Sequence, residues 1–465
     1  MTIRVNPHRF SGVVKVPPSK SHTIRQLLIA SLSDGVSEII NPLDSLDTRS
    51  CLSVCRVFGA EITEHKKDDL LVWKIKGNNN FKNNYNSPVF SESAESAAKR
   101  LSVNIGNSGT TLFFALALAG LQSEWIEFTG DSQIQNRSAA PLLDALSCFG
   151  VQQRSSNGHT PIMVKGLWKG GTAILPCPTS QYLSALLISA PLAPSGIITE
   201  IEVPFLNEKP YVEMTISYLK AQKVTVTVKK FGNSLCFRIP GGSGYKAFSS
   251  NVPADFSSAA FSAAAAAITG GPVTLLGLNL QDTQGDKYFF EILKKMGCKC
   301  QAKSPKKAFF AKKPDAITIY REGFLKGGVF DLNDTPDLLP AAAVVAAYAK
   351  GDTIFTNVAN ARIKETDRIA VLRQELAKFG VCCTELPDEL IVHGKGGLNG
   401  LTSPVSIDGH GDHRIVMAFA VAALGSPVPV EISTAECTAT SYPAFFEMVS
   451  EKNDKFDNRL VRQLG

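Results

Sequence analysis

Six stretches of the chain are apolar at almost every position, and each one follows a short polar motif. They read TIRQLLIASLSDG, TLFFALALAG, QYLSALLISAPLA, SSAAFSAAAAAITGG, LLPAAAVVAAYAKG and HRIVMAFAVAALG, starting at Thr23, Thr111, Gln181, Ser257, Leu338 and His413. Successive starts lie 70 to 88 residues apart. A helix that is apolar all round is buried, and a fixed period indicates repeats. We therefore predict six buried helices in six similar units.

A second kind of segment, with one apolar face, follows most of the buried helices. SCLSVCRVFGAEI, APLLDALSCFGVQ, FFEILKKMGCKC and IAVLRQELAKFGVCC end their helical patterns at Gly59, Gly150, Gly297 and Gly380, whereas YVEMTISYLKAQKVTV lacks the glycine. Short runs such as DLLVWKIKG and SLCFRIPGG are typical of strands. Any α/β protein alternates such elements, but the regular spacing favours a repeated unit of two helices and several strands.

Composition narrows the class of protein. The chain has 465 residues, with 44% hydrophobic and 19% charged, so we expect a soluble globular protein of more than one domain. A net charge of +6 is mild at this length and suits small acidic substrates better than DNA. The Asn- and Ser-rich segment 76–100 interrupts the period, and we expect an exposed insertion there.

Three further features concern the cellular compartment. The ten cysteines are scattered without a CxxC pair, which favours a reducing compartment over a disulfide framework. The first residues, MTIRVNPHRFSG, have no apolar core of the kind found in signal peptides. No run of 18 apolar residues is present, so we expect no membrane span. The sequence predicts a cytoplasmic protein.

The candidate chemistry lies at the front ends of the buried helices. The six leading motifs are SKSHTIR, GNSGTT, CPTSQ, PADFSS, NDTPD and GDHR. Helix N-termini offer free N–H groups and partial positive charge, and they bind phosphate and carboxylate. The cations in or beside the motifs are Lys20, Arg25, Arg137, Arg362, Lys364, Arg368 and Arg414. If several of these ends share one cleft, that cleft attracts polyanions.

The acids near these motifs are fewer and stand apart. They are Asp337 in NDTPD, with Glu365 and Asp367 in KETDR. A carboxylate embedded among cations suits general base work on an anionic substrate, with Glu365 as a partner acid. Each motif alone also has an ordinary interpretation: KETDR as a solvated helix start, GNSGTT as a loop without the lysine of a P-loop. HGDH, from His410 to His413, is more typical of a capping turn than of a metal site.

Taken together, the motifs resemble a known family. PPSKSHTIR, GNSGTT, PTSQYLSALL, EKPYVEMT, NDTPD, RIKETDR, GDHRIVMA and SYPAFF resemble 5-enolpyruvylshikimate-3-phosphate synthases, in the right order from about residue 10 to 450. The resemblance implies a two-domain inside-out α/β barrel of six βαβαββ repeats, three per domain, that closes over its substrates. Domain one is then expected at 1–18 and 253–465, and domain two at 19–252.

The resemblance also implies a reaction and its residues. The enolpyruvyl group of phosphoenolpyruvate passes to the 5-hydroxyl of shikimate 3-phosphate, with release of phosphate, through a tetrahedral intermediate and without metal or cofactor. Asp337 is the expected base, and Lys20 and Glu365 are candidates for proton delivery. The expected shikimate 3-phosphate contacts are Lys20, Ser21, Arg25, Thr179, Ser180, Gln181, Tyr211, Asp337, Asn360 and Lys364. The expected phosphoenolpyruvate contacts are Lys20, Asn107, Gly109, Arg137, Gln181, Arg368 and Arg414.

Four positions depart from the family pattern. Phe113 and Gln133 stand where arginine is common, and Thr440 stands where lysine is common. Glu208 stands where a phosphate-contacting serine often precedes KPY. The site therefore carries fewer cations than is usual, which bears on phosphoenolpyruvate affinity and on the response to inhibitors.

Two other functions are alternatives to the one implied by the resemblance. UDP-N-acetylglucosamine enolpyruvyl transferase shares fold and chemistry but relies on a loop cysteine, and GDSQIQNR holds none. A nucleic-acid-binding protein would cluster lysines with aromatics, as KSPKKAFFAKK at 303–313 does, but this segment lies outside every helix-start motif. We therefore expect two small-molecule substrates, no nucleic acid or membrane partner, and a monomer.

Overall fold

The computed structural model describes residues 1–78, 101–303, 315–451 and 461–464. Most of the predicted insertion and of the basic segment KSPKKAFFAKK lies outside these residues. By their internal contacts the residues form two compact units, Met1–Ser19 with Pro253–Gly465, and Lys20–Val252. We call them the first and the second unit and describe each by itself.

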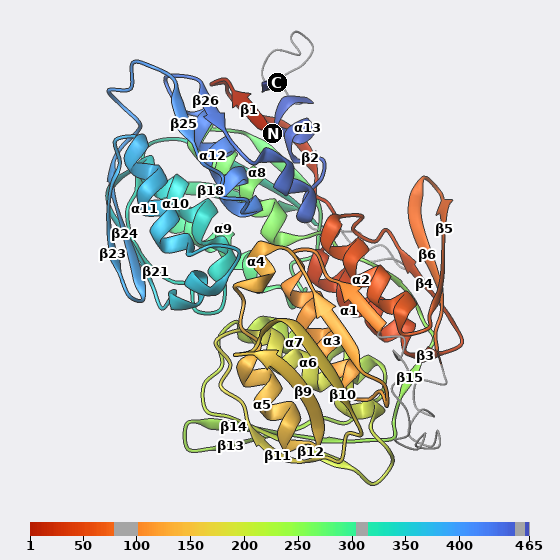
Figure 1. Cartoon of the computed structure of the whole chain (residues 1–465). Helices are drawn as coiled ribbons and strands as arrows, with labels where there is room; N and C mark the ends of the chain where they lie inside the picture. The colour runs from red at the N-terminus through yellow and green to blue at the C-terminus, as the bar shows by residue number, and fades with distance from the viewer. Residues whose placement is uncertain (79–100, 304–314, 452–460, 465) are drawn as a thin grey trace. The chain divides into compact units, whose positions relative to one another are not determined.

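The six predicted buried helices are present, three in each unit (Figure 1). The second unit holds α1 (Lys20–Ser31), α3 (Gly109–Ala119) and α6 (Ser180–Ser189), and the first holds α8 (Phe256–Thr269), α10 (Leu339–Ala347) and α12 (His413–Leu424). Every residue of α10 and α12 is buried. In the first unit α8, α10 and α12 contact one another. Their small alanine side chains permit this close approach.

One helix start differs from the prediction. The apolar pattern begins at Thr23, but α1 begins at Lys20. Lys20 and Ser21 therefore lie in the first turn of the helix and not in a loop before it. Side-chain caps hold four of the other starts, where Ser108, Thr179, Asp255 and Asp412 accept hydrogen bonds from backbone N–H groups of α3, α6, α8 and α12.

The one-sided helices are also confirmed. They are α2 (Leu46–Val57), α5 (Ala140–Cys148), α7 (Lys209–Ala221), α9 (Phe289–Lys295) and α11 (Arg368–Lys378). The glycines that follow four of them all have positive φ, from 73° at Gly380 to 106° at Gly297, a conformation that glycine adopts without strain. After α7 the left-handed residue is Lys223, with φ 60°.

Shorter helices are α4 (Ser132–Gln135), α13 (Phe445–Glu451) and the 3-10 turns η2 (Ala190–Leu192), η3 (Gly285–Tyr288), η4 (Pro336–Leu338), η5 (Ala359–Ile363) and η6 (Ala435–Thr440).

Six sheets repeat one strand pattern, in which the first pair is parallel and the next two pairs are antiparallel. In the second unit the orders are β16 (Ser249–Asn251), β4 (Val36–Ile40), β6 (Leu70–Lys76), β5 (Glu61–Lys67); β7 (Leu101–Asn104), β8 (Ile126–Thr129), β10 (His159–Gly166), β9 (Val151–Ser156); and β11 (Gly171–Ile174), β12 (Ile198–Val203), β14 (Ser234–Pro240), β13 (Thr227–Phe231). A parallel pair of short strands, β3 (Ser33–Asp34) and β15 (Tyr245–Lys246), completes this unit.

The first unit repeats the pattern three times. Its orders are β2 (Gly12–Lys15), β17 (Val273–Leu278), β19 (Asp315–Arg321), β18 (Cys298–Lys303); β20 (Leu325–Lys326) and β21 (Val329–Asp331) beside β22 (Ala349–Thr356), then β24 (Glu389–Lys395), β23 (Cys382–Leu386); and β25 (Val405–Ile407), β26 (Val430–Ile432), β1 (Thr2–Val5), β27 (Val461–Leu464). The common pattern confirms the six-repeat α/β architecture with helices inside and sheets outside.

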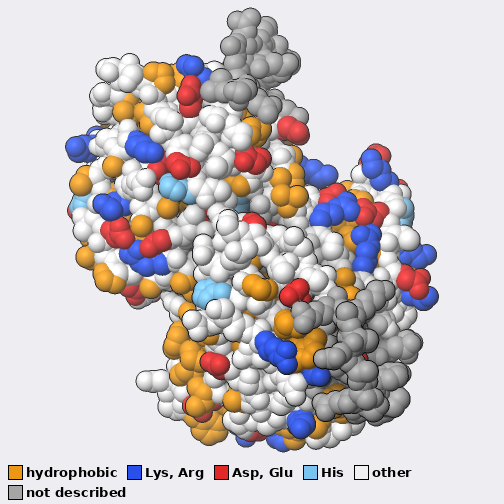
Figure 2. Space-filling model, in the orientation of Figure 1, with side chains coloured by type: hydrophobic (Ala, Val, Ile, Leu, Met, Phe, Trp, Pro, Cys, Tyr) orange, Lys and Arg blue, Asp and Glu red, His pale blue; other side chains and the backbone are white. Residues whose placement is uncertain are grey.

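The last strand of several sheets is an exposed edge. In β5 and β13 every residue is at least partly exposed. Figure 2 shows charged side chains of both signs over the β5–β6 hairpin. Charges of this kind keep an open edge from pairing with another chain. Among the described residues, no helix has the length and apolar character needed to cross a membrane.

Candidate active site

The centre of the site in the first unit is Arg368, the first residue of α11. Its guanidinium is almost completely buried, with 1% of the side chain exposed. It donates to three carboxylates: Nη1 to Asp337 Oδ1 at 2.8 Å, Nη2 to Glu365 Oε2 at 2.6 Å, and Nε to Asp412 Oδ2 at 2.8 Å. The sequence predicts that the acids stand apart, but in the structure Asp337, Glu365 and Asp412 lie together. They come from three separate segments and meet on one arginine.

Asp337, in η4 before the buried helix α10, also contacts a second arginine. Arg414 Nη2 lies 3.0 Å from Asp337 Oδ2, and Arg414 Nη1 donates to the Asp337 carbonyl at 3.3 Å. Burial alone raises the pKa of Asp337, but Arg414, Lys364 and Arg368 outweigh it and hold the pKa well below its usual range. Asp337 is therefore an ionised carboxylate held between two guanidinium groups.

Asp367 and Asp412 cap the helices α11 and α12, on which these arginines lie. Asp367 caps α11 by accepting from Ala370 N at 3.1 Å and pairs with Arg362 at 2.7 Å. Asp412 accepts from the backbone N–H of Arg414 at 2.9 Å, so HGDH is the predicted capping turn. Among the described residues no group of three or more His, Cys, Asp or Glu could hold a metal ion.

A further buried acid lies near this cluster. Asp286, in η3, is 1% exposed and accepts a short hydrogen bond from Ser257 Oγ at the start of α8. Burial, and then the negative charge of Asp337, raise the pKa of Asp286 to about 7, against the opposing influence of Arg414 and Ser257. Asn360, a predicted substrate contact in η5, is buried and donates to the Asn333 carbonyl at 3.2 Å. Asp286 was not among the predicted site residues, although QGDKY places it just before a helix.

In the second unit, α1 carries two of the predicted cations. Lys20 Nζ donates to Asp47 Oδ2 at 2.8 Å, and Asp47 is a buried acid in the first turn of α2. Arg25 is 2% exposed, and in the described part of the chain it donates only to neutral oxygens. These are Thr215 Oγ1 at 2.8 Å, the Ser21 and Tyr211 carbonyls at 3.1 and 3.2 Å, and Ser184 Oγ at 3.5 Å. Arg25 thus brings Ser21 and Tyr211, both predicted contacts, to one guanidinium.

The start of α6 holds the predicted phosphate clamp. Thr179 is the N-cap, and its hydroxyl accepts from Gln181 N at 3.4 Å. Glu208 reaches this point from the start of α7. Its Oε2 accepts from Thr179 Oγ1 at 3.1 Å, Ser180 N at 3.1 Å and Ser180 Oγ at 2.9 Å. Residue 208 is unusual in the sequence, but the sequence does not predict where its carboxylate lies.

A third set of predicted residues meets at the start of α3. Arg137 Nη2 donates to Asn107 Oδ1 at 3.3 Å, and Asn107 donates a short hydrogen bond to Gln133. A Cβ atom on Gly109 would overlap the Arg137 guanidinium, so only glycine allows this close approach. Gln133, one of the departures from the family pattern, therefore contacts the predicted phosphoenolpyruvate residues directly.

Two other departures are buried positions. Phe113 packs edge-on against Tyr182, with ring centroids 4.9 Å apart, inside the core of the second unit. Thr440, at the end of η6, is 8% exposed. Phe113 is therefore a core residue whose ring packs against the ring of Tyr182.

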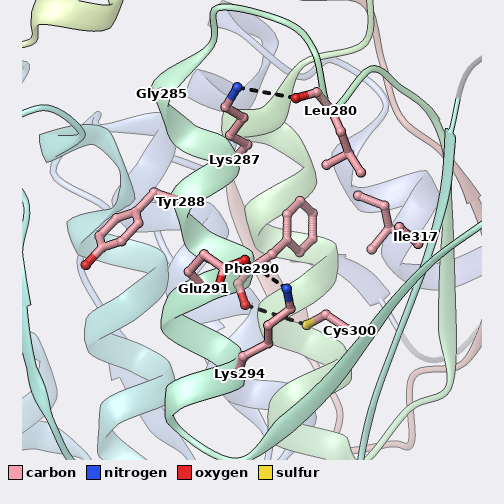
Figure 3. A pocket seen from close by; sticks show the side chains of 10 residues that line it. Leu280, Gly285, Lys287, Tyr288, Phe290, Glu291, Lys294, Cys300 and Ile317 are labelled. Atoms are coloured by element: carbon pink, nitrogen blue, oxygen red, sulfur yellow. Dashed lines mark hydrogen bonds and ion pairs between the residues drawn. The ribbon is translucent and has the colours of Figure 1, made fainter.

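A pocket of about 380 Å³ in the first unit is separate from the predicted site residues. It is lined by Leu280, Tyr288, Phe290 and Ile317 together with polar residues of η3, α9 and β18 (Figure 3). None of the predicted site residues lines it. The charged cluster around Arg368, and not this largely apolar pocket, is the candidate for chemistry in the first unit.

The chain is similar to known proteins over almost its whole length. The profile of the family EPSP synthase (3-phosphoshikimate 1-carboxyvinyltransferase) matches residues 5–449. The chain is 40% identical over 453 residues to the 3-phosphoshikimate 1-carboxyvinyltransferase of Acetivibrio thermocellus, covering 97% of this chain and 98% of the relative. It is 36% identical over 443 residues to the protein of that name from Methanothermobacter thermautotrophicus, with 95% of each chain covered.

Solved structures show the same fold. EPSP synthase from Acinetobacter baumannii superposes with a TM-score of 0.72 at 28% identity, covering 97% of this chain and 98% of that one. The enolpyruvyl transferase NikO from Streptomyces tendae shares the fold at 16% identity, with a TM-score of 0.70 over 99% and 98% of the two chains. With the family profile matching nearly the whole chain, and with the charged motifs in their predicted order, this chain belongs to the EPSP synthase family.

Proposed function

We propose that the protein transfers the enolpyruvyl group of phosphoenolpyruvate to the 5-hydroxyl of shikimate 3-phosphate and releases inorganic phosphate. The observation that carries this proposal is the placement of Asp337, an ionised carboxylate between Arg368 and Arg414. A base surrounded by cations suits a reaction in which both substrates are anions and negative charge accumulates.

The reaction requires one proton to leave oxygen and one to reach carbon. The 5-hydroxyl oxygen forms a bond to C2 of phosphoenolpyruvate while its proton passes to Asp337. The methylene carbon C3 accepts a proton, for which Glu365 and Lys20 are the candidate donors, and the tetrahedral intermediate results. The C2–O bond to phosphate then breaks, C3 returns a proton to the group that supplied one, and the proton on Asp337 leaves with the phosphate.

Substrate binding explains how a weakly basic Asp337 becomes a useful base. In the free protein Arg414, Lys364 and Arg368 lower its pKa. The carboxylate and phosphate of phosphoenolpyruvate would form charge-assisted hydrogen bonds with Arg368 and Arg414. Their positive charge would then be shared with the substrate, and the pKa of Asp337 would rise towards its ordinary value. The base would become effective only when the substrate is in place.

The second unit supplies most of the contacts to the acceptor and further contacts to phosphoenolpyruvate. Thr179 and Ser180 offer two hydroxyls and a backbone N–H at the start of α6 for the 3-phosphate. Arg25, Ser21 and Tyr211 form a second group for the same substrate. Gln181, which follows Ser180 in the chain, is a further contact of this substrate. Asn107, Gly109 and Arg137 form the group for phosphoenolpyruvate, while Lys364 and Asn360 of the first unit bind the acceptor. The protein acts as a monomer, which analytical ultracentrifugation would show as a single species with the mass of one chain.

The test is a phosphate-release assay with purified protein, shikimate 3-phosphate and phosphoenolpyruvate. The proposal predicts release that requires both substrates, and an enolpyruvyl ether product visible by NMR. The matched assay replaces shikimate 3-phosphate with UDP-N-acetylglucosamine, and no release is expected there. Turnover on the sugar nucleotide alone would assign the protein to the rival transferase instead.

A further inference from the structure

Glu208 places a carboxylate on the donors at the start of α6. Its Oε2 accepts three hydrogen bonds, from Thr179 Oγ1 at 3.1 Å, Ser180 N at 3.1 Å and Ser180 Oγ at 2.9 Å. Glu208 is 2% exposed, and Thr179 and Ser180 are also buried. One carboxylate oxygen of Glu208 therefore accepts hydrogen bonds from two hydroxyls and one backbone N–H that converge on it.

The surrounding backbone holds Glu208 at this position. Glu208 has a left-handed conformation, with φ 57°, which is uncommon for a residue other than glycine. The preceding residue, Asn207, donates from its backbone N–H to the Cys177 carbonyl at 3.1 Å and from Nδ2 to the Pro178 carbonyl at 3.4 Å. The loop before α7 is thus tied to the loop before α6. The carboxylate is a built feature of the fold and not a side chain that happens to lie nearby.

A phosphate ester needs the same kind of donors that Glu208 now uses. Helix N-termini with added hydroxyls bind phosphate through N–H and O–H groups aimed at its oxygens. A phosphate that approached while the carboxylate stayed in place would find these donors already used, and its oxygens would meet the acceptor oxygens of Glu208 inside a buried site. The carboxylate must therefore leave the donors, or the phosphate must bind with fewer of them.

We infer that Glu208 is a specificity-determining residue that competes, as an internal anion, with the phosphate ester of the acceptor for Thr179 and Ser180. This inference rests on the proposed function, because it takes shikimate 3-phosphate as the acceptor. With Glu208 in place, the preference of the protein for the phosphorylated acceptor over the unphosphorylated one should be smaller than it would be if Thr179 and Ser180 were unoccupied. Removing the charge at 208 should restore that discrimination.

The experiment measures Glu208→Gln and Glu208→Ser beside the wild type. Gln keeps the shape and an accepting oxygen without the charge, and Ser removes the occupant. The matched control is Glu213→Gln on the same helix α7, where the carboxylate is 53% exposed and lies 3.5 Å from Lys209. Steady-state assays give KM for each substrate, and calorimetry gives Kd for shikimate 3-phosphate and for shikimate without phosphoenolpyruvate.

The inference predicts a selective change. Both Glu208 variants should lower KM and Kd for shikimate 3-phosphate by roughly ten-fold, the change expected for one buried charge-assisted contact. The KM for phosphoenolpyruvate and the Kd for shikimate should stay within about two-fold of the wild type, as should every constant of the control. Weaker or unchanged binding of shikimate 3-phosphate in both variants would show that Glu208 positions the donors and does not compete for them.

The two proposals fail in different ways. If the wild type released no phosphate from the two substrates, the proposed function would fail, yet the calorimetric comparison of shikimate 3-phosphate with shikimate would still decide the role of Glu208. If turnover were normal and the variants bound shikimate 3-phosphate no better, only the inference on Glu208 would fail. Should Glu208→Ser not fold, Glu208→Gln alone carries the test, since it preserves the hydrogen-bonding shape.

Discussion

Two buried arginines, one in each unit, have opposite surroundings. Arg368 in the first unit donates to Asp337, Glu365 and Asp412. Arg25 in the second unit donates to hydroxyl and carbonyl oxygens and lies over the Phe114 ring at 5.4 Å. Burial lowers the pKa of both guanidinium groups, but the three carboxylates raise that of Arg368 above its usual value, whereas the pKa of Arg25 falls to about 10.

The difference separates two tasks of an active site. Around Arg368 the charges are already balanced within the protein, so the cluster holds a carboxylate in a fixed place for proton transfer. Around Arg25 a positive charge is buried without a carboxylate partner from the described residues, which is costly unless an anion arrives to balance it. The first arrangement suits chemistry and the second suits the binding of an anionic substrate, and the following experiments test that division.

The largest effect is expected from Asp337→Ala. Removing a general base lowers rates by roughly 10² to 10⁴-fold, and we expect kcat to fall by about 10³-fold while the Kd for shikimate 3-phosphate changes less than about three-fold. Steady-state phosphate release measures the first quantity and calorimetry the second. Asp352→Asn, at a carboxylate that is 58% exposed in the same unit, is the control and should keep full activity. Full activity in Asp337→Ala would remove it as the base.

The next effect separates the two arginines directly. Arg368→Met leaves three carboxylates without their guanidinium, and breaking a buried ion pair in this way costs about 3–5 kcal/mol. Among the described residues, Arg25→Met leaves only neutral acceptors without their donor, and this costs about 1–3 kcal/mol of stability. Native-state hydrogen exchange reads each unit separately. Protection in α11 and α12 should fall by roughly 10² to 10³-fold in the first variant, and protection in α1 and α7 by less in the second.

A surface arginine on the same helix provides the control for this pair. Arg373, on α11, contacts Glu385 at 2.8 Å and is 54% exposed. Exposed pairs contribute less than about 1 kcal/mol, so Arg373→Met should change protection by only a few-fold. Equal losses in Arg368→Met and Arg25→Met would mean that the surrounding carboxylates do not distinguish the two sites.

The repeat and its motifs were predictable because they depend on local pattern. An apolar run after a polar motif fixes a buried helix, as in α10 and α12, and a glycine with positive φ fixes where a one-sided helix ends, as at Gly380. Both signals lie within some fifteen neighbouring residues. The start of α1 was misplaced by three residues because Lys20 and Ser21 are polar, and polar residues carry no apolar signal in a first turn.

The partners of the charged residues were not predictable from the sequence. Arg368 and Asp412 are 44 residues apart, and Arg25 and Thr215 are 190 apart. Which acid meets which base depends on how the repeats pack, and a single sequence carries no local sign of it. For this reason Asp412 and Asp47 were missed as ion-pair partners, and Glu208 was noticed only because the resemblance made it unusual.

The smallest effect for each pH unit is expected from Asp286→Asn, and it tests whether acid crowding in the first unit makes its stability depend on pH. Burial, followed by the charge of Asp337, raises the pKa of Asp286 to about 7 from an ordinary value of 3.8. Between these values the native protein holds a proton that the unfolded chain has lost, so wild-type stability falls as pH rises. The loss is at most about 1.4 kcal/mol for each pH unit, and Asn at 286 removes it.

Thermal midpoints of wild type and Asp286→Asn, measured from pH 4 to pH 8, give the difference at each pH. That difference should shift in favour of the variant between about pH 4 and pH 7 and then stay constant, because above pH 7 both states of the wild type are ionised at this group. Asp144→Asn, at an exposed position on α5 of the second unit, is the control and should give a small difference that is the same at every pH. A flat difference for Asp286→Asn would mean that Asp286 is ionised in the native protein, so that Arg414 and Ser257 outweigh burial and Asp337. Asp286 would then be a further carboxylate whose charge the arginines of the first unit balance. The contrast with Arg25, which has no carboxylate partner among the described residues, would be larger.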